Sequence, residues 1–321
     1  MPSLKEIKGR ISSVNSTRKI TSAMKMVASS KLHHAQQMIE NMLPYENMLE
    51  RILLTFLASE ADAQTAFSQV RPVKRIAIVA YSSNSSLCGG FNANVAKLLN
   101  SLVQENISLG KENIVVYPIG RKIADQVKKM GLPIAGDFSH LPDNPNVATC
   151  ISIAKELGNK FLAGELDRVE LIYHHFKSAG SQILQRKTFL PLDIAATVGQ
   201  DNDRDLSQKT VTPEMQAYLR DNQKEEHKVK DTVKPLNDNF IVEPDINSVL
   251  QVLVPKLAHL MLYTALLDSL ASEHAARMVA MQTATDNADE LLRELNLQYN
   301  KSRQQAITNE LLDIVGGSVN N

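Results

Sequence analysis

A heptad pattern of apolar residues occupies both ends of this chain of 321 residues. From Ser3 to about Leu57, apolar residues recur at alternating spacings of four and three, which is the pattern of a coiled-coil seam. The pattern returns from about Ile246 to Val315. At ~1.5 Å per residue the two segments would form helices of roughly 80 Å and 105 Å. Such lengths exclude a single compact core for the whole chain.

The seam positions define how these two helices can meet. In the N-terminal segment they are Ile7, Ile11, Val14, Ala28, Leu32, Ala35, Ile39, Met42, Leu49, Leu53 and Phe56. In the C-terminal segment they are Leu250, Leu253, Leu257, Leu260, Leu267, Ala271, Met278, Met281, Ala288, Leu292, Leu295 and Tyr299. Because the chain between them folds separately, the simplest arrangement pairs them with each other in antiparallel fashion. We predict coiled-coil helices over 1–58 and 246–317, with a kink at Pro44.

Three polar residues interrupt the first seam, namely Arg18, Thr21 and Lys25. They are either a tolerated polar patch or a level of the helix that faces something other than its partner helix. If residues near Phe56 pair with residues near Leu250, the numbers of paired residues add to about 306. That register places Lys25 near Met281, one helical turn from Arg277.

Between the helices the period changes to alternating strands and helices over about residues 73–200. The predicted strands are VKRIAIVAYSS, NIVVYPIG, RVELIYHHF and QILQRKTFLPL, and the predicted helices follow LCGG, begin at RKIADQV and cover 147–162. This alternation is typical of a Rossmann-like α/β domain with a largely parallel sheet. We expect this domain to fold without the long helices.

Residues of catalytic or metal-binding type form no convincing constellation. SSLCGGFN follows a strand but matches neither dinucleotide nor P-loop spacing, which argues against nucleotide binding. His174 and His175 are neighbours on a predicted strand, so they point to opposite faces and are expected to be edge or surface residues. Cys88 and Cys150 are interpreted as ordinary thiols in a reducing compartment. We predict no catalytic, cofactor-binding or metal-binding residues and no cofactor.

Two further features concern solubility and mobility. Lysine plus arginine equals aspartate plus glutamate at 35 each, which gives no electrostatic argument for nucleic acid. No uninterrupted run approaches the ~20 apolar residues of a membrane span, and the first residues lack a secretion signal.

The charged stretch 201–239 has few apolar residues, so we predict a flexible or weakly helical insertion that is dispensable for turnover.

The chain ends on the apolar sequence ITNELLDIVGG. With paired residue numbers adding to about 306, Ser3 lies near residue 303, so the C-terminal helix continues alone for about 15 Å. Its apolar residues would then need another surface to cover them. These tip residues are Ile307, Leu311, Leu312, Ile314 and Val315, and Gly316 and Gly317 are expected to end the helix.

Three segments carry a specific resemblance. LKEIKGRISSVNSTRKITSAMKMVASSKL, SSLCGGFNANV and SEHAARMVAMQTATDNADELLRELNLQYNKSRQQAITNELLDIVGG resemble the gamma subunit of the rotary F-type ATP synthase. The resemblance implies a coiled-coil shaft inside a ring of alternating nucleotide-binding subunits, with the α/β domain as a foot on the membrane rotor ring. Ion-driven rotation of the shaft would drive the catalytic subunits through their binding states. The shaft itself would not be an enzyme.

The resemblance also implies partners and contact residues. One copy would assemble with the alpha and beta subunits, the epsilon subunit and the membrane ring of c subunits. Contacts with the catalytic ring would lie near Met24, Lys25, Arg277, Gln304 and Thr308, and an apolar sleeve would surround the tip. The insertion is longer than in most bacterial members and has no cysteine, which argues against the thiol control of plant-plastid members.

Location and rival functions complete the expectations. The long helix begins almost at Met1, which favours the cytoplasmic face of a bacterial inner membrane over a processed mitochondrial or chloroplast form. The first rival is a homodimeric structural coiled-coil protein, and the second is a nucleotide-binding α/β enzyme.

Overall fold

The computed structural model describes residues 3–59, 66–193, 204, 243 and 245–319. They form two compact units. The shaft unit combines Met1–Ala28 with Arg277–Asn321, and the sheet unit is Ser29–Ala276. The predicted insertion 201–239 lies outside the described residues, except for Arg204.

Two long helices run through both units: α1 spans Leu4–Ser59 and α7 spans Ile246–Val319. The Oγ of Ser3 accepts a hydrogen bond of 3.2 Å from the backbone N–H of Glu6, which caps the first turn of α1 as its sequence predicts. Pro44 and Pro255 lie inside helices that continue on both sides of them. The expectation that Gly316 and Gly317 end α7 is wrong, because the helix continues to Val319. Glycine permits a left-handed terminus but does not impose one.

Within the shaft unit, cross-helix contacts fix the antiparallel pairing. The hydroxyl oxygens of Thr21 and Thr285 lie 2.8 Å apart, and Arg18 Nη1 lies 3.1 Å from Asp289 Oδ1. Their residue numbers add to 306 and 307, so the predicted register is confirmed. Apolar seam positions on both helices are buried at Ile7, Met281, Ala288 and Leu295.

The sheet unit contains a four-stranded sheet in the order β2-β1-β3-β4. The strands are β1 (Ile76–Tyr81), β2 (Ile114–Ile119), β3 (Arg168–Ser178) and β4 (Ser181–Leu190). β1 pairs in parallel with both β2 and β3, whereas β3 and β4 form an antiparallel hairpin. The largely parallel sheet predicted from the sequence is therefore present, with one antiparallel edge strand.

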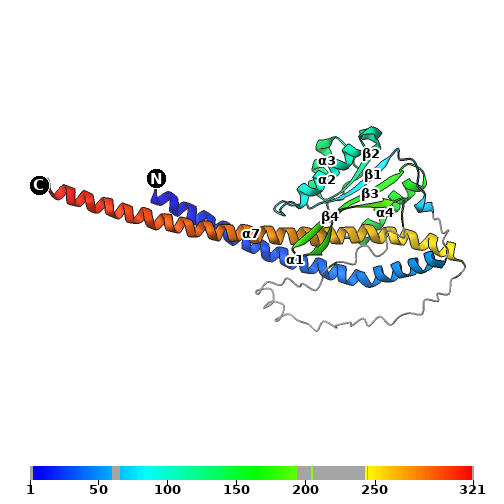
Figure 1. Cartoon of the computed structure of the whole chain (residues 1–321), viewed down its shortest axis with the longest axis horizontal. Coiled ribbons are helices and arrows are strands. Elements are labelled where there is room, and N and C mark those ends of the chain that lie inside the picture. The colour runs from blue at the N-terminus through cyan, green and yellow to red at the C-terminus, as the bar shows by residue number, and fades with distance from the viewer. Residues whose placement is uncertain (1–2, 60–65, 194–203, 205–242, 244, 320–321) are drawn as a thin grey trace. The chain divides into compact units, whose positions relative to one another are not determined.

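Helices cover both faces of this sheet, as Figure 1 shows. On one face, α2 (Phe91–Glu105) and α3 (Arg121–Met130) bury an aliphatic cluster against alternate residues of the strands. On the other face lie α4 (Val147–Leu162) and the first part of α7. The Tyr81 hydroxyl donates to the carbonyl of Leu262 at 2.9 Å, which joins β1 to α7. Short 3₁₀ turns occupy Ala66–Ser68, Ile107–Leu109 and Lys111–Asn113.

The part of α7 inside the sheet unit is a core helix rather than half of a two-stranded seam. Every side chain from Leu260 to Glu273 is buried. Consequently α7 contains a window that is long and apolar enough to span a membrane, and 61% of that window is buried inside the protein. Polar residues such as Asp268 and Ser269 interrupt this stretch, so it is not an uninterrupted apolar run. A helix that is apolar on all sides and buried is the centre of a folded core.

Candidate functional site on the long helices

The interrupted seam forms a polar level in the shaft unit. Thr21 is buried, and its hydroxyl contacts both Thr285 Oγ1 and the carbonyl of Arg18. Arg18 and Asp289 pair at half-exposed positions, with side-chain exposures of 39% and 52%. An exposed pair of this kind contributes about 0–1 kcal/mol. For Arg18 and Thr21, the tolerated polar patch is therefore the correct interpretation, since both contact α7.

Three of the predicted contact residues belong to neighbouring levels of the paired helices. Met24 and Lys25 are half-buried on α1, and Arg277 is half-buried on α7. The register set by Thr21 and Thr285 places Lys25 opposite Met281, one turn from Arg277. Two cations thus occupy adjacent turns of the shaft unit.

Exposed apolar side chains accompany this cationic level. Ile20 is 59% exposed and Val27 is 58% exposed, and Met26 and Val279 also face solvent. They are not among the predicted contact residues, although they fall outside the seam frame and are therefore exposed in any pairing of the two helices. A surface that mixes such residues with cations is suited to contacts that form and break.

The other two predicted contact residues lie much further along α7. Gln304 and Thr308 are exposed, and the Thr308 hydroxyl donates to the Gln304 carbonyl at 2.9 Å. From Arg277 to Gln304 the helix rises about 40 Å. The five predicted contact residues thus form two separate groups.

The apolar tip is exposed. Ile307 is 49%, Leu311 57% and Leu312 64% exposed. Ile314 and Val315 belong to α7, but their side chains lie outside the described residues. By the observed register, the first residue of α1, Leu4, pairs near residue 302, and Figure 1 shows that end of α1 well short of the end of α7. The described part of α1 therefore does not cover the tip.

The glycine turn after β1 is held by its own side chains. Asn92 accepts from the backbone N–H of Ser83 at 3.0 Å and donates to Cys88 Sγ at 3.1 Å. The Oγ of Ser82 accepts from the backbone N–H of Ile123 at the start of α3, at 3.0 Å. The backbone N–H groups of Ser83 and Ile123 are therefore satisfied within the protein.

The two adjacent histidines are buried, so the expectation that they lie on an edge or surface is wrong. They do point to opposite faces: His174 stacks on Phe91 of α2 at 4.3 Å between centroids, whereas His175 Nδ1 lies 2.8 Å from Asp268 Oδ2 of α7. Burial lowers the pKa of His174 to about 4 and raises the pKa of the Cys150 thiol to about 12. Within the described parts of the chain, no group of three or more His, Cys, Asp or Glu residues could hold a metal ion.

One buried polar cluster was missed by sequence reasoning. Asp268 pairs with Arg204 and His175, and Arg204 also approaches Glu46. The available signal was Asp268 itself, a single acid within the otherwise uncharged stretch LAHLMLYTALLDSLAS. Charged residues are almost never fully buried unless they are paired.

Comparison with known proteins places these features in a family context. The chain matches the family described as ATP synthase over residues 3–319. It is 50% identical over 319 residues to the ATP synthase gamma chain of Phocaeicola vulgatus, covering 99% of this chain and 100% of the relative. It is 40% identical over 319 residues to the gamma chain of Flavobacterium johnsoniae, covering 99% and 98%.

Solved structures show a similar fold. The rotational state 3 structure of the Euglena gracilis mitochondrial ATP synthase contains a chain with a TM-score of 0.57 and 18% identity, covering 98% of this chain and 93% of that one. A chain of the central stalk and c-ring structure from Tetrahymena thermophila gives a TM-score of 0.54 and 24% identity, covering 83% and 99%.

Proposed function

Because this chain belongs to the ATP synthase gamma-chain family, we propose that it works as the rotor shaft of its complex. In this role it couples ion-driven rotation of a membrane ring to conformational cycling of the catalytic subunits, and so to ATP synthesis or hydrolysis. The chain is a subunit of an enzyme complex, and we assign no chemical step to its own residues.

The observation that carries this proposal is the apolar tip of α7. Ile307, Leu311 and Leu312 lie beyond the start of α1 and are about half exposed or more. Leaving this surface in water is unfavourable by roughly 25 cal/mol per Å². An apolar sleeve at the far end of a catalytic ring would cover it. Because apolar contacts are non-directional, such a sleeve supports the shaft at every rotational angle without holding it at one.

The polar level supports contacts of a different kind. Half-buried Lys25 and Arg277 can form charge pairs with a surrounding ring, and exposed pairs of this kind are worth roughly 0.2–1 kcal/mol. Contacts of this size form and break readily as a shaft turns. We assign Met24, Lys25 and Arg277 to one zone of ring contact, and Gln304 and Thr308 to a second zone next to the tip.

The proposed assembly has one copy of this chain. The alpha and beta subunits form the ring around the paired helices, while the epsilon subunit and the ring of c subunits contact the sheet domain. The complex is membrane-associated, and we place this chain on the cytoplasmic face. The bacterial origin of the similar gamma chains supports that placement.

Tip variants test the sleeve. Truncation after Thr308 is expected to weaken assembly and thermal stability of the complex while leaving some coupling. The double variant Leu311→Asp and Leu312→Asp should be worse, because it places charge inside an apolar sleeve. Gln305→Asp with Asn309→Asp adds the same charge at exposed polar positions and serves as the control. Normal assembly and ATP synthesis by the Leu311, Leu312 variant would refute the sleeve.

A further inference from the structure

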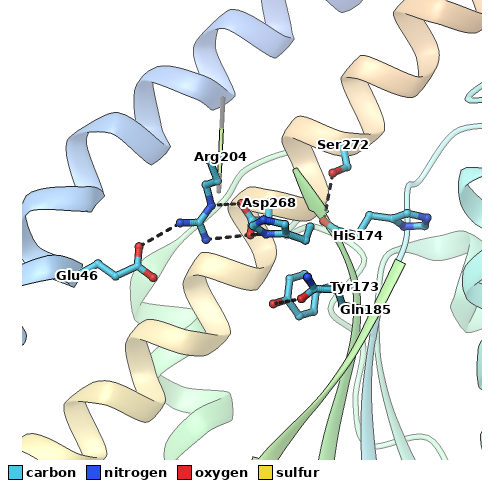
Figure 2. Close-up of polar contacts among 8 residues, drawn as sticks. Glu46, Tyr173, His174, Gln185, Arg204, Asp268 and Ser272 are labelled. Carbon is cyan, nitrogen blue, oxygen red and sulfur yellow. Dashed lines mark hydrogen bonds and ion pairs between the residues drawn. The ribbon is translucent and has the colours of Figure 1, made fainter. Parts of the chain in front are cut away.

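Asp268 is an acidic residue with no exposed surface, carried on the core segment of α7. A carboxylate in such a position is costly unless several donors satisfy its oxygens. Asp268 meets this requirement through three donor atoms on two residues, Arg204 and His175. Figure 2 shows the Arg204 guanidinium directed at the Asp268 carboxylate.

Arg204 supplies the principal contact. Its Nε donates to Asp268 Oδ1 at 2.9 Å, and its Nη2 donates to Oδ2 at 3.0 Å, which is a bidentate arrangement. The Arg204 side chain is only 3% exposed. The planar guanidinium fixes distance and orientation together, which a lysine ammonium does not.

Two further segments join at the same place. His175 Nδ1 on β3 lies 2.8 Å from Asp268 Oδ2, and since a carboxylate only accepts, this ring nitrogen carries the hydrogen. The Nη1 of Arg204 lies 3.5 Å from Glu46 Oε2 on α1. The cluster therefore joins α1, α7, the central sheet and the chain that follows β4. We call these four residues the Arg204 clasp.

Other polar contacts fasten the sheet to α7 on either side of the clasp. The Ser272 hydroxyl donates to the carbonyl of His174 at 3.2 Å, and the Tyr81 hydroxyl donates to the carbonyl of Leu262 at 2.9 Å. Most of the side chains that surround these contacts are apolar, and apolar contacts are non-directional. The polar contacts add a defined orientation of α7 relative to the sheet.

We propose that the Arg204 clasp is a torsional lock, with Arg204 as the positioning residue that holds the sheet against both long helices. A buried ion pair is often no more stabilising than an apolar pair of the same volume, but it can specify a single geometry. A single geometry is what torque transmission between a driven sheet domain and its helices requires. This use of the clasp rests on the rotor function proposed above.

The test compares the full chain with a double variant, Arg204→Met with Asp268→Leu, which removes both charges and keeps an apolar core. Spin labels at Lys129→Cys on α3 and Glu40→Cys on α1 report the distance between sheet and helix by pulsed electron paramagnetic resonance. Both positions are exposed, whereas Cys88 and Cys150 are buried and escape labelling. The matched control is Arg186→Met, which takes an arginine from buried Glu170 on β3 and from Glu105 on α2, neither of which lies on a long helix.

The double variant should widen the distance distribution at least twofold, while the Arg186→Met control keeps the wild-type width. In the assembled complex, the double variant should stall at a lower opposing load than wild type. An unchanged width overturns the lock, and a wider distribution with an unchanged stalling load overturns its role in torque. If the double variant does not fold, Arg204→Lys replaces it, because lysine keeps the positive charge but cannot form the bidentate contact. The distance distribution and the stalling load are then measured for Arg204→Lys in the same way. Since the distance measurement needs no rotation, a wild-type complex that fails to rotate would overturn the rotor function and leave the lock itself intact.

Discussion

The hydroxyl oxygens of Thr21 and Thr285 lie 2.8 Å apart across the two long helices. Each hydroxyl also contacts a carbonyl of its own helix, from Arg18 and Met281 respectively. Two hydroxyl hydrogens serve three contacts, so one threonine donates to its own helix while the other donates across the seam. This hydrogen-bonded pair fixes the register of the two helices at a position where the seam has no apolar contact.

Replacing both threonines by valine should therefore stabilise the paired helices. The change removes two hydroxyls from the seam and retains the β-branched shape, and we expect a gain of about 1 kcal/mol. The single variants should be less stable than the double variant, because each leaves one hydroxyl against a methyl group. Thermal unfolding monitored by circular dichroism measures the stability of the two single variants and of the double variant. A double variant less stable than either single one would show that the hydroxyl contact itself holds the helices together.

His174 should make the sheet unit sensitive to acid. Burial lowers the pKa of His174 to about 4 from an ordinary value of 6.5, and its Nδ1 has no hydrogen-bond partner among the described residues. Below pH 6.5 His174 is protonated in the unfolded chain but stays neutral in the folded chain. The free energy of unfolding therefore falls as the pH drops from 6.5 to about 4. The loss is on the order of 3 kcal/mol.

The variant His174→Phe keeps a ring stacked on Phe91 and removes the titrating group. Its unfolding free energy should equal or exceed that of wild type at pH 7. Its advantage should grow between pH 6.5 and 4 and then stay level. Denaturant titrations at several pH values give this difference directly. A constant difference between the two proteins across that range would mean that His174 does not titrate as described.

Arg277 and Gln304 should affect the assembled complex more than the isolated chain. Arg277 is half-buried and Gln304 is exposed, so Arg277→Ala and Gln304→Ala should each change the stability of the chain by less than about 1 kcal/mol. Coupled ATP synthesis should fall in both variants because each removes a side chain of the proposed contact with the ring. Helicity and synthesis are measured side by side. Reduced helicity with normal coupling would reverse the assignment.

The structure changes what is expected from deletions in the charged insertion. Deleting residues 205–230 spares Arg204 and should leave assembly and turnover near wild type. Deleting residues 201–230 removes Arg204 and leaves the buried Asp268 carboxylate with the His175 contact but without its arginine, and breaking a buried pair in this way costs about 3–5 kcal/mol. Adding Asp268→Leu to the longer deletion should restore stability. Equal thermal stability of the two deletion proteins would contradict this account.

The contacts of the sheet with α7 argue against the predicted independent fold of residues 73–200, which stays untested. One face of the sheet packs against α7. Tyr81 is hydrogen-bonded to the carbonyl of Leu262, and His175 is hydrogen-bonded to Asp268. A fragment of residues 73–200 lacks α7 and exposes that face, so we now expect it to unfold without cooperativity. A chain of residues 29–276 keeps the whole unit and should unfold in one transition. Calorimetry of both fragments decides between the two expectations.

These results separate what periodicity can reveal from what it cannot. The strands, α4 and the register of the long helices followed from local pattern, because side-chain period and seam position depend on neighbouring residues. The role of α7 as a core helix did not, since a fully buried helix breaks the two-stranded seam pattern. The clasp was missed for another reason. Arg204 and Asp268 are 64 residues apart, and only the folded chain brings them together.

Direct observation of rotation tests the central claim. A probe attached through Lys129→Cys on exposed α3 would report motion of this chain inside a catalytic ring fixed to a surface, since both native cysteines are buried. With ATP supplied, the account predicts stepwise rotation of the probe in one direction, which stops when ATP is removed. A complex that hydrolyses ATP at a normal rate while the probe stays still would contradict it.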